Sequence, residues 1–361
     1  MTSRAFKNRD RQYRRWFANF VLCLCSLVVS VLLTEMGIRI LAPQHMSGVV
    51  FEYAPRGYTV IKSEATALYS VGDRKGIYHF MPHHLRGVST PTAGATRILV
   101  LGDSFTFGVG LDDEDTYVAL LQKKLDTAFG AGQFVLLNAG IPGSGSAEHL
   151  AFLEDFAAEI EPRAVIIFIS IDDFDRASRS PLYRLSEQAV LSLDEGNAPK
   201  SMLKELVTDS RIYNFLIQHA HVAQLIRRFI IDKLYSPNRK LASVGAPGSN
   251  SESGAEQKRL VRALFRRMKA WCDSHDIRFA VINNGWQSYD WLPDLLRSEN
   301  IVVFDAAPRV QPAIRLDMTS YAIPEDGHPN PKGAELIADA VWPFLQSFVN
   351  ESGLRRSPHP G

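Results

Sequence analysis

An apolar strand that ends at a small polar loop decides much of how this chain can fold. Residues 97–101 are mostly apolar, as in a buried strand, and Gly102-Asp103-Ser104 follow at once. A helix expected just after this loop places the Ser104 hydroxyl at the carboxyl edge of a sheet and its backbone N–H at a helix N-terminus. Both features suit a serine nucleophile that attacks a carbonyl group. A plain turn, in which Asp103 or Ser104 only caps the helix, is the structural alternative.

Strand and helix patterns alternate along most of the chain. Strands are expected at residues 97–101, 134–137, 164–171, 278–283 and 301–304. Helices are expected at about 118–129, 147–160, 256–274, 289–297 and 331–349. Short links between such elements are typical of a parallel sheet with helices on both faces. We therefore expect an α/β fold: a three-layer α/β/α domain over residues 97–350, with a parallel sheet of about five strands.

A long insertion, at about residues 177–257, interrupts this alternation. Residues 182–194 alternate as in a β-hairpin, residues 202–235 indicate one or two helices, and residues 245–254 read as a flexible loop rich in Gly and Ser. An insertion at the carboxyl edge of a sheet often shapes a substrate cleft. The alternative is a structural elaboration away from the site.

The uncharged apolar run Phe17–Leu33 follows a strongly basic head. Residues 1–16 hold six Arg or Lys side chains against one acid, whereas the rest of the chain carries 34 basic and 38 acidic side chains. Residues 17–42 together are long enough to cross a bilayer, which takes about 20 residues. Positive charge before the span predicts a cytoplasmic N-terminus and an extracytoplasmic remainder. Beside such a span, the basic head is a topology signal rather than a sign of nucleic-acid binding. A cleaved signal peptide or a buried core helix is the alternative.

Residues 43–96 form a juxtamembrane segment with many Gly and Pro residues and no clear period. The segment either contributes an edge strand or holds the domain away from the membrane, and residues 351–361 form a tail.

Cysteine and glycine spacing excludes several kinds of site. Cys23 and Cys25 lie inside the apolar span and Cys272 is the only other cysteine, so no disulfide can form within the rest of the chain. Metal-binding Cys/His spacing, phosphate loops and dinucleotide fingerprints are all missing from the sequence. We expect no cofactor, no metal ion and no nucleic-acid partner.

A second polar motif, Asp326-Gly327-His328-Pro329-Asn330, precedes the last expected helix. Together with the earlier Gly102-Asp103-Ser104, it resembles the SGNH (GDSL-type) hydrolase family over residues 97–349, leaving out the insertion. The resemblance implies that Ser104 is the nucleophile, His328 the base and Asp326 the acid that orients the imidazole. Glu325, three residues before the histidine, is the alternative acid.

The resemblance also implies an oxyanion hole made of two backbone N–H groups and an asparagine side chain. The backbone donors correspond to Ser104 and Gly140. The family's Gly-x-Asn-Asp stands here as Ser170-Ile171-Asp172-Asp173, so Asp172 takes the place of the asparagine. An ionised carboxylate about 4 Å from an oxyanion repels it by a few kcal/mol at an effective dielectric constant near 20. We therefore expect that Asp172 is protonated, that two backbone donors suffice, or that the site is weak.

These patterns predict a membrane-anchored, extracytoplasmic serine esterase or acyltransferase. The resemblance favours O-acetyl groups of a glycan or exopolysaccharide as substrate, and a bacterial inner membrane with the domain in the periplasm. A non-catalytic glycan-binding protein is the alternative that Asp172 favours. A lipid esterase would need an apolar cleft, for which the candidates are Phe174, the 182–193 hairpin, Trp286 and Trp291. The acids at 172, 173 and 175 also admit a metal-assisted hydrolase.

Overall fold

The computed structural model divides the chain into two compact units. The smaller comprises Met1–Ser47 and Arg211–Ala242, and the larger Gly48–Ser210 and Ser243–Gly361. The structure describes residues 2–42, 50–87, 94–170, 172–186, 191–193, 215–217, 219–235, 252–286, 290–324, 326–351 and 354.

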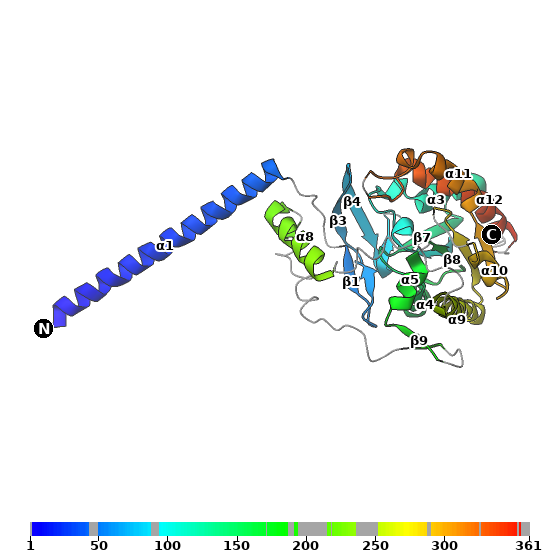
Figure 1. Cartoon of the computed structure of the whole chain (residues 1–361), viewed down its shortest axis with the longest axis horizontal. Helices are drawn as coiled ribbons and strands as arrows, with labels where there is room; N and C mark the ends of the chain where they lie inside the picture. Colours follow the sequence, from blue (N-terminus) through cyan, green and yellow to red (C-terminus); the bar gives the residue numbers. More distant parts are fainter. Residues whose placement is uncertain are drawn as a thin grey trace. The chain divides into compact units, whose positions relative to one another are not determined.

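An eight-stranded sheet organises the larger unit (Figure 1), with the strand order β12-β11-β8-β6-β7-β5-β4-β3. The pairs β11–β12, β8–β11, β6–β8 and β6–β7 are all parallel. Their bounds are β6 Thr96–Gly102, β7 Phe134–Gly140, β8 Ala164–Ile169, β11 Arg278–Asn283 and β12 Val302–Asp305. These strands confirm the predicted parallel part of the sheet.

The remaining strands of this sheet come from the segment before residue 96. Strands β3 (Thr66–Val71) and β4 (Arg74–Met81) form an antiparallel hairpin, and β5 (Leu85–Arg86) joins β4 to β7. Gly72 lies in the two-residue turn at a φ of 56° and provides the left-handed backbone that such turns require. The segment thus extends the sheet to eight strands rather than five. A separate pair, β1 (Phe51–Tyr53) and β2 (Thr59–Ile61), precedes the hairpin.

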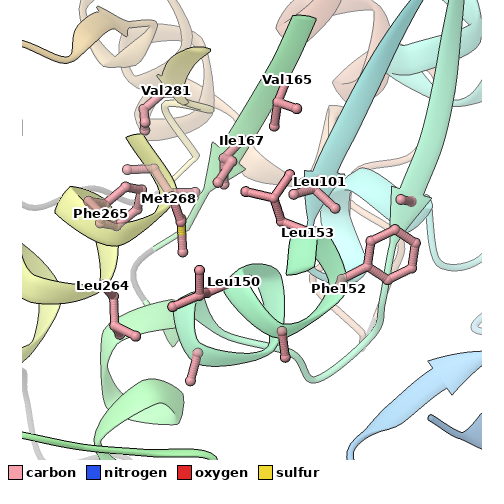
Figure 2. Close-up of a cluster of buried hydrophobic side chains, with 14 of the residues drawn as sticks. Leu101, Leu150, Phe152, Leu153, Val165, Ile167, Leu264, Phe265, Met268 and Val281 are labelled. Carbon is pink, nitrogen blue, oxygen red and sulfur yellow. The ribbon is translucent and has the colours of Figure 1, made fainter. Parts of the chain in front are cut away.

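Helices cover both faces of the parallel strands, which confirms the three-layer arrangement. Val165 and Ile167 of β8 lie in one buried cluster, and the alternate residues Ile166 and Phe168 lie in the other. The first cluster includes side chains of α4 (Ser146–Ile160), α9 (Glu252–Ser274) and α10 (Leu292–Arg297), as Figure 2 shows in part. The second includes side chains of α3 (Tyr117–Phe129), α11 (Ala307–Leu316) and α12 (Pro331–Glu351).

Two helices of the structure were not predicted from the sequence. Helix α5 (Asp172–Arg179) begins where a loop was expected, because its acids at 172, 173 and 175 stand in the first turn, where the helix dipole favours negative charge. Helix α11 contains Pro312 in its interior. Because proline normally interrupts a helix, a sequence with proline at this position does not predict one.

The insertion is described in part. Strands β9 (Tyr183–Leu185) and β10 (Leu191–Leu193) are antiparallel, as the expected hairpin requires. Helix α9 starts at Glu252, before the predicted residue 256. Residues 202–214 and 245–251 lie outside the described residues.

The smaller unit contains α1 (Thr2–Leu41) and α8 (His221–Tyr235). Residues Arg14–Leu41 of α1 are long and apolar enough to cross a membrane, with a mean hydropathy of 2.4 and no part of the window buried. The Glu35 carboxylate accepts hydrogen bonds from the backbone N–H groups of His221 and Val222, at 2.8 and 2.9 Å. The end of the apolar helix is therefore joined to the start of α8.

Candidate active site

Ser104 stands at the junction of β6 and the one-turn helix α2 (Ser104–Phe107). The Asp103 carboxylate caps this turn by accepting the Phe105 N–H at 2.9 Å. A side chain at Gly102 would collide with Thr106 Oγ1, so the strand must end on a glycine for the turn to form. The result is a serine that is only 7% exposed, at the carboxyl edge of the sheet.

His328 and Asp326 lie beside this serine. His328 Nε2 is 2.8 Å from Ser104 Oγ, and His328 Nδ1 is 2.5 Å from Asp326 Oδ1. Burial alone would raise the pKa of Asp326, but the hydrogen bond and the charge of His328 outweigh it and lower that pKa. The arrangement favours a proton on Nδ1 and leaves Nε2 to accept the serine proton. Glu325, the alternative acid, lies outside the described residues.

The loop that carries the pair is fixed at both ends. Ile323 donates its N–H to His328 O at 2.7 Å, and the Asn330 side chain donates to Ser320 O and Ala322 O. Asn330 Oδ1 also accepts the Gly333 N–H in the first turn of α12. The motif therefore forms a tight turn that leads directly into the last helix.

The β3–β4 hairpin packs against this loop. A Cβ at Gly72 would lie 2.6 Å from Ile323 Cγ2 and 3.0 Å from Pro324 O. Buried Arg86 of β5 donates hydrogen bonds to the carbonyls of Phe107, Gly108 and Leu111, just after Ser104. Strands from the N-terminal segment thus support both halves of the candidate triad.

A buried cluster of charges surrounds Asp103, the residue before Ser104. Asp103 Oδ2 accepts hydrogen bonds from Ser170 Oγ at 2.8 Å and from Arg176 Nη1 at 3.0 Å. Asp173 is fully buried, and burial together with the nearby Asp103 carboxylate raises its pKa well above the usual value. One guanidinium therefore compensates two buried acids, one of which directly precedes Ser104.

Asp172, which was expected in the oxyanion hole, lies at the edge of this cluster. Its side chain is 63% exposed, and Asp172 Oδ2 is 3.2 Å from Arg176 Nη2. An ion pair with a permanent cation reduces the field that this carboxylate exerts on a neighbouring negative charge.

Gly140 does not offer the free N–H group that the resemblance implied. Its N–H donates to Asn138 Oδ1 at 2.9 Å, and a Cβ there would collide with Phe107 N. The reason is that β7 continues to Gly140, the register partner of Gly102 in β6, instead of ending at residue 137. Gly140 is a close-packed glycine of the strand.

The loop after β7 lies against the segment that carries Ser104. Ile141 donates its N–H to Gly102 O at 2.9 Å, and Ser144 Oγ donates to Ile141 O at 2.7 Å. Gly143 has a φ of 84°, and a Cβ at this position would have no atom within 4 Å. Among the described residues, the N–H groups of Ser104 and Gly143 have no acceptor. The resemblance pointed to Gly140, the first glycine after the predicted strand, whereas the N–H group without an acceptor among the described residues belongs to Gly143.

A cavity of about 320 Å³ borders this loop. Its wall includes the apolar side chains of Pro142 and Leu182 and the charged side chains of Arg56 and Glu148. Burial raises the pKa of Glu148, whose carboxylate accepts the Gly145 N–H at 2.9 Å. The residues of β1–β2, the loop after β7 and α4 together therefore form a small pocket with mixed chemistry.

The proposed lipid-binding side chains lie mostly inside the fold. Phe174 and Trp286 are buried, and the Trp286 ring packs against Phe105 at 5.8 Å between centroids. Trp291 packs against Phe174 at 5.5 Å. These residues stabilise the core and do not line an open apolar cleft. Within the described part of the chain, no cluster of His, Cys, Asp and Glu could hold a metal ion.

Comparison with known proteins places these features in a family. A family model described as GDSL-like lipase/acylhydrolase matches residues 100–336. Esterase TesA of Pseudomonas aeruginosa is 40% identical over 85 residues, which cover 23% of this chain and 41% of that protein. The match therefore spans less than half the length of that relative.

Solved structures of esterases are similar at low sequence identity. A two-domain esterase active on acetylated mannans is 17% identical, with a TM-score of 0.41, over 74% of this chain and 53% of that one. A catalytic mutant of Axe2, an acetylxylan esterase from Geobacillus stearothermophilus, is 14% identical, with a TM-score of 0.38, over 74% of this chain and 100% of that one.

Proposed function

Because this chain belongs to the GDSL-like lipase/acylhydrolase family, we propose that it is a membrane-anchored serine esterase or acyltransferase that acts on O-acetyl groups of a glycan or exopolysaccharide. The observation that carries the proposal is the chain of short contacts from Ser104 Oγ to His328 Nε2 and from His328 Nδ1 to Asp326. In this proposal Ser104, His328 and Asp326 are the catalytic residues.

The reaction follows from the positions of these three side chains. Ser104 Oγ bonds to the ester carbonyl carbon while its proton passes to His328 Nε2, and the carbonyl oxygen takes the electron pair. When this intermediate collapses, the bond to the alcohol oxygen breaks and His328 returns the proton to the leaving alcohol. Water or a sugar hydroxyl then attacks the acyl-serine and loses its proton to His328. The bond between the acyl carbon and Ser104 Oγ breaks, His328 returns the proton to Ser104 Oγ, and the acid or the new ester leaves. Asp326 orients the imidazole and stabilises its charged form.

We place the developing oxyanion between the backbone N–H groups of Ser104 and Gly143. Both are without an acceptor in the described chain, and the loop that carries Gly143 is hydrogen-bonded to Gly102, two residues before Ser104. One such donor typically contributes a factor of about 10² to 10³ to the rate. The ion pair of Asp172 with Arg176 supports the view that two backbone donors suffice here.

The small cavity beside Gly143 supports a small acyl group and a polar acceptor. Its volume of about 320 Å³ lies at the lower end of ligand pockets. Arg56 and Glu148 contribute polar side chains to its wall, whereas Phe174 and Trp286, two of the candidates for a lipid cleft, are buried. These features favour an acetylated glycan over a long-chain lipid.

We further propose that α1 anchors the protein, with the N-terminus in the cytoplasm and the larger unit in the periplasm of a bacterium. The apolar window of Arg14–Leu41 and the basic residues before it support this orientation. An intact mass measurement of the membrane-extracted protein tests the anchor, because a cleaved signal sequence would remove α1.

Labelling with a fluorophosphonate probe tests the catalytic proposal. The probe should modify the full-length protein and the control Ser298→Ala, whose hydroxyl only donates to Leu295 O, but not Ser104→Ala. Absence of labelling in the folded wild-type protein would contradict catalysis and favour the glycan-binding alternative. Release of acetate from acetylated polysaccharides, compared with hydrolysis of a long-chain ester, then tests the substrate class.

A further inference from the structure

The first residues of α8, and His219 just before it, are hydrogen-bonded to side chains near the C-terminal end of α1. Both oxygens of the Glu35 carboxylate accept N–H groups of α8, from His221 and Val222. Arg39 Nη2 donates to Glu35 Oε1 at 3.1 Å and to His219 O at 3.2 Å. The first N–H groups of a helix have no acceptor within the helix, and its positive end attracts a carboxylate. Glu35 therefore fixes where α8 begins.

The position of Glu35 along α1 corresponds to the outer edge of the membrane core. Phe17 and Glu35 are about 27 Å apart along a helix that rises about 1.5 Å per residue. The hydrocarbon core of a bilayer is about 30 Å thick. With Trp16 at the inner interface, where tryptophan is enriched, Glu35 lies at the outer hydrocarbon boundary and Arg39 lies among the headgroups.

Helix α8 exposes apolar side chains on one face. Leu225, Ile226 and Phe229 follow the spacing of a helical stripe and are 40%, 54% and 60% exposed. Val222, half-buried and in the first turn, belongs to the same stripe. An exposed apolar stripe on a helix marks a surface that binds an apolar partner.

We propose that α8 lies on the outer surface of the bilayer that α1 crosses, with Leu225, Ile226 and Phe229 inserted among the headgroups and upper acyl chains. The proposal rests on the membrane anchoring of α1 proposed above. Leu225 and Ile226 come about one turn, or roughly 6 Å, after the residues that Glu35 holds. The headgroup layer is roughly 5 to 7 Å thick on each side, so the stripe begins inside that layer.

A helix that stood upright from the membrane would take Phe229 out of this layer, whereas a helix along the surface keeps the whole stripe within it. The lipid surface is therefore the occupant that the Glu35 contact favours. The chain then contacts the membrane twice, through α1 and through α8.

Fluorescence quenching in lipid nanodiscs tests this proposal on the full-length protein. Cys23, Cys25 and Cys272 are replaced, and an environment-sensitive NBD label is attached at Ile226→Cys. Two reference positions are labelled separately: Val28→Cys within α1, and Leu316→Cys, which is 88% exposed in α11 of the larger unit. Lipids carry a doxyl quencher either near the headgroup or at mid-chain.

The label at Ile226 should be quenched several-fold more than the label at Leu316 by the doxyl group near the headgroup. Equal quenching at these two positions, with strong mid-chain quenching at Val28, would overturn the α8 proposal and leave the anchor intact. Absence of quenching at Val28 would overturn the anchor itself. A blue-shifted but unquenched label at Ile226 would mean that protein covers the stripe, which also contradicts the proposal.

The variant Glu35→Ala tests the tie between the two helices. It should reduce the quenching at Ile226 while the quenching at Val28 stays unchanged, because only the cap of α8 is lost. Unchanged quenching at Ile226 would overturn the role given to Glu35. Fluorophosphonate labelling of Ser104 serves as the control that the larger unit is folded.

Discussion

Two acidic regions lie close to Ser104, and the pKa values of their carboxyl groups are shifted in opposite directions. The loop at 322–330 pairs the partly exposed Asp326 with the imidazole of His328, which changes charge in the proposed reaction, and the pKa of Asp326 is lowered. In the second region, Asp103 and Asp173 are buried against the permanent cation of Arg176, and the pKa of Asp173 is raised. The comparison suggests that the first region supports reactivity and the second supports structure, which separates the expected effects of mutations in each.

The largest expected effect is on activity, from the reactive region. His328→Asn removes the group that takes the serine proton, so kcat/KM for a small acetyl ester should fall by about 10⁴-fold or more. Thermal unfolding should barely change, because the side chain lies at the edge of the fold. A variant that keeps activity within about tenfold of the wild type would remove His328 from its proposed role.

The second prediction concerns the buried cluster, where a mutation should reduce stability rather than activity. Arg176→Met leaves two buried carboxylates without their cation and should lower the free energy of unfolding by about 3 to 5 kcal/mol. Denaturation with urea measures it, with Arg179→Met on the same helix as the control, since that side chain is exposed. If both variants lose the same small amount, the buried cluster is not a structural element.

The third prediction separates the regions by pH. The pKa of Asp173 is higher in the folded state than in the unfolded chain. The contribution of this group to the free energy of unfolding is therefore lost as the pH rises above the usual aspartate pKa of about 3.9. The pKa of Asp326 is lowered in the folded state. Its contribution to the free energy of unfolding is therefore present above the usual aspartate pKa and is lost as the pH falls below it.

Asp173→Asn should therefore make the free energy of unfolding fall less between about pH 4 and pH 7 than it does in the wild type. Asp326→Asn should leave that interval unchanged. Urea denaturation at several pH values measures both variants, and identical pH profiles for Asp173→Asn and the wild type would contradict the assignment.

The smallest effect is expected at Asp172, at the exposed edge of the buried cluster. Its exposed ion pair with Arg176 should contribute about 0 to 1 kcal/mol to stability. With two backbone donors for the oxyanion, Asp172→Asn should change kcat/KM by less than about tenfold. A large rise in rate would instead show that the carboxylate repels the oxyanion, and a complete loss would make it part of the catalytic machinery.

The parallel strands and the polar residues at their ends could be predicted because they carry local signals. Five apolar runs bounded by helical patterns identify the sheet, and the two polar motifs around Ser104 and His328 stand at element boundaries. The structure brings Ser104 within hydrogen-bond distance of His328, and His328 within hydrogen-bond distance of Asp326. None of these features required knowledge of a distant contact.

The parts that were missed depend on distant contacts. Whether Gly140 offers a free N–H is decided by Asn138 and Phe107, and the position of Asp172 is decided by Arg176. The β3–β4 hairpin belongs to the sheet because β5 joins it to β7, and its side chains pack in a cluster with Phe107. Such elements cannot be recognised from propensity alone.

The contact between the hairpin and the loop at 323–324 has a practical meaning for anyone who wishes to obtain a water-soluble form of the enzyme. A shortened protein that starts at residue 97, where the strand with the serine begins, would lose Gly72 and Arg86 and with them the support of both motifs. A shortened protein that starts at about residue 50 retains them. The N-terminal boundary of the folded larger unit is therefore set close to the end of α1, the proposed anchor, and the family match from residue 100 onward marks only part of what must be expressed.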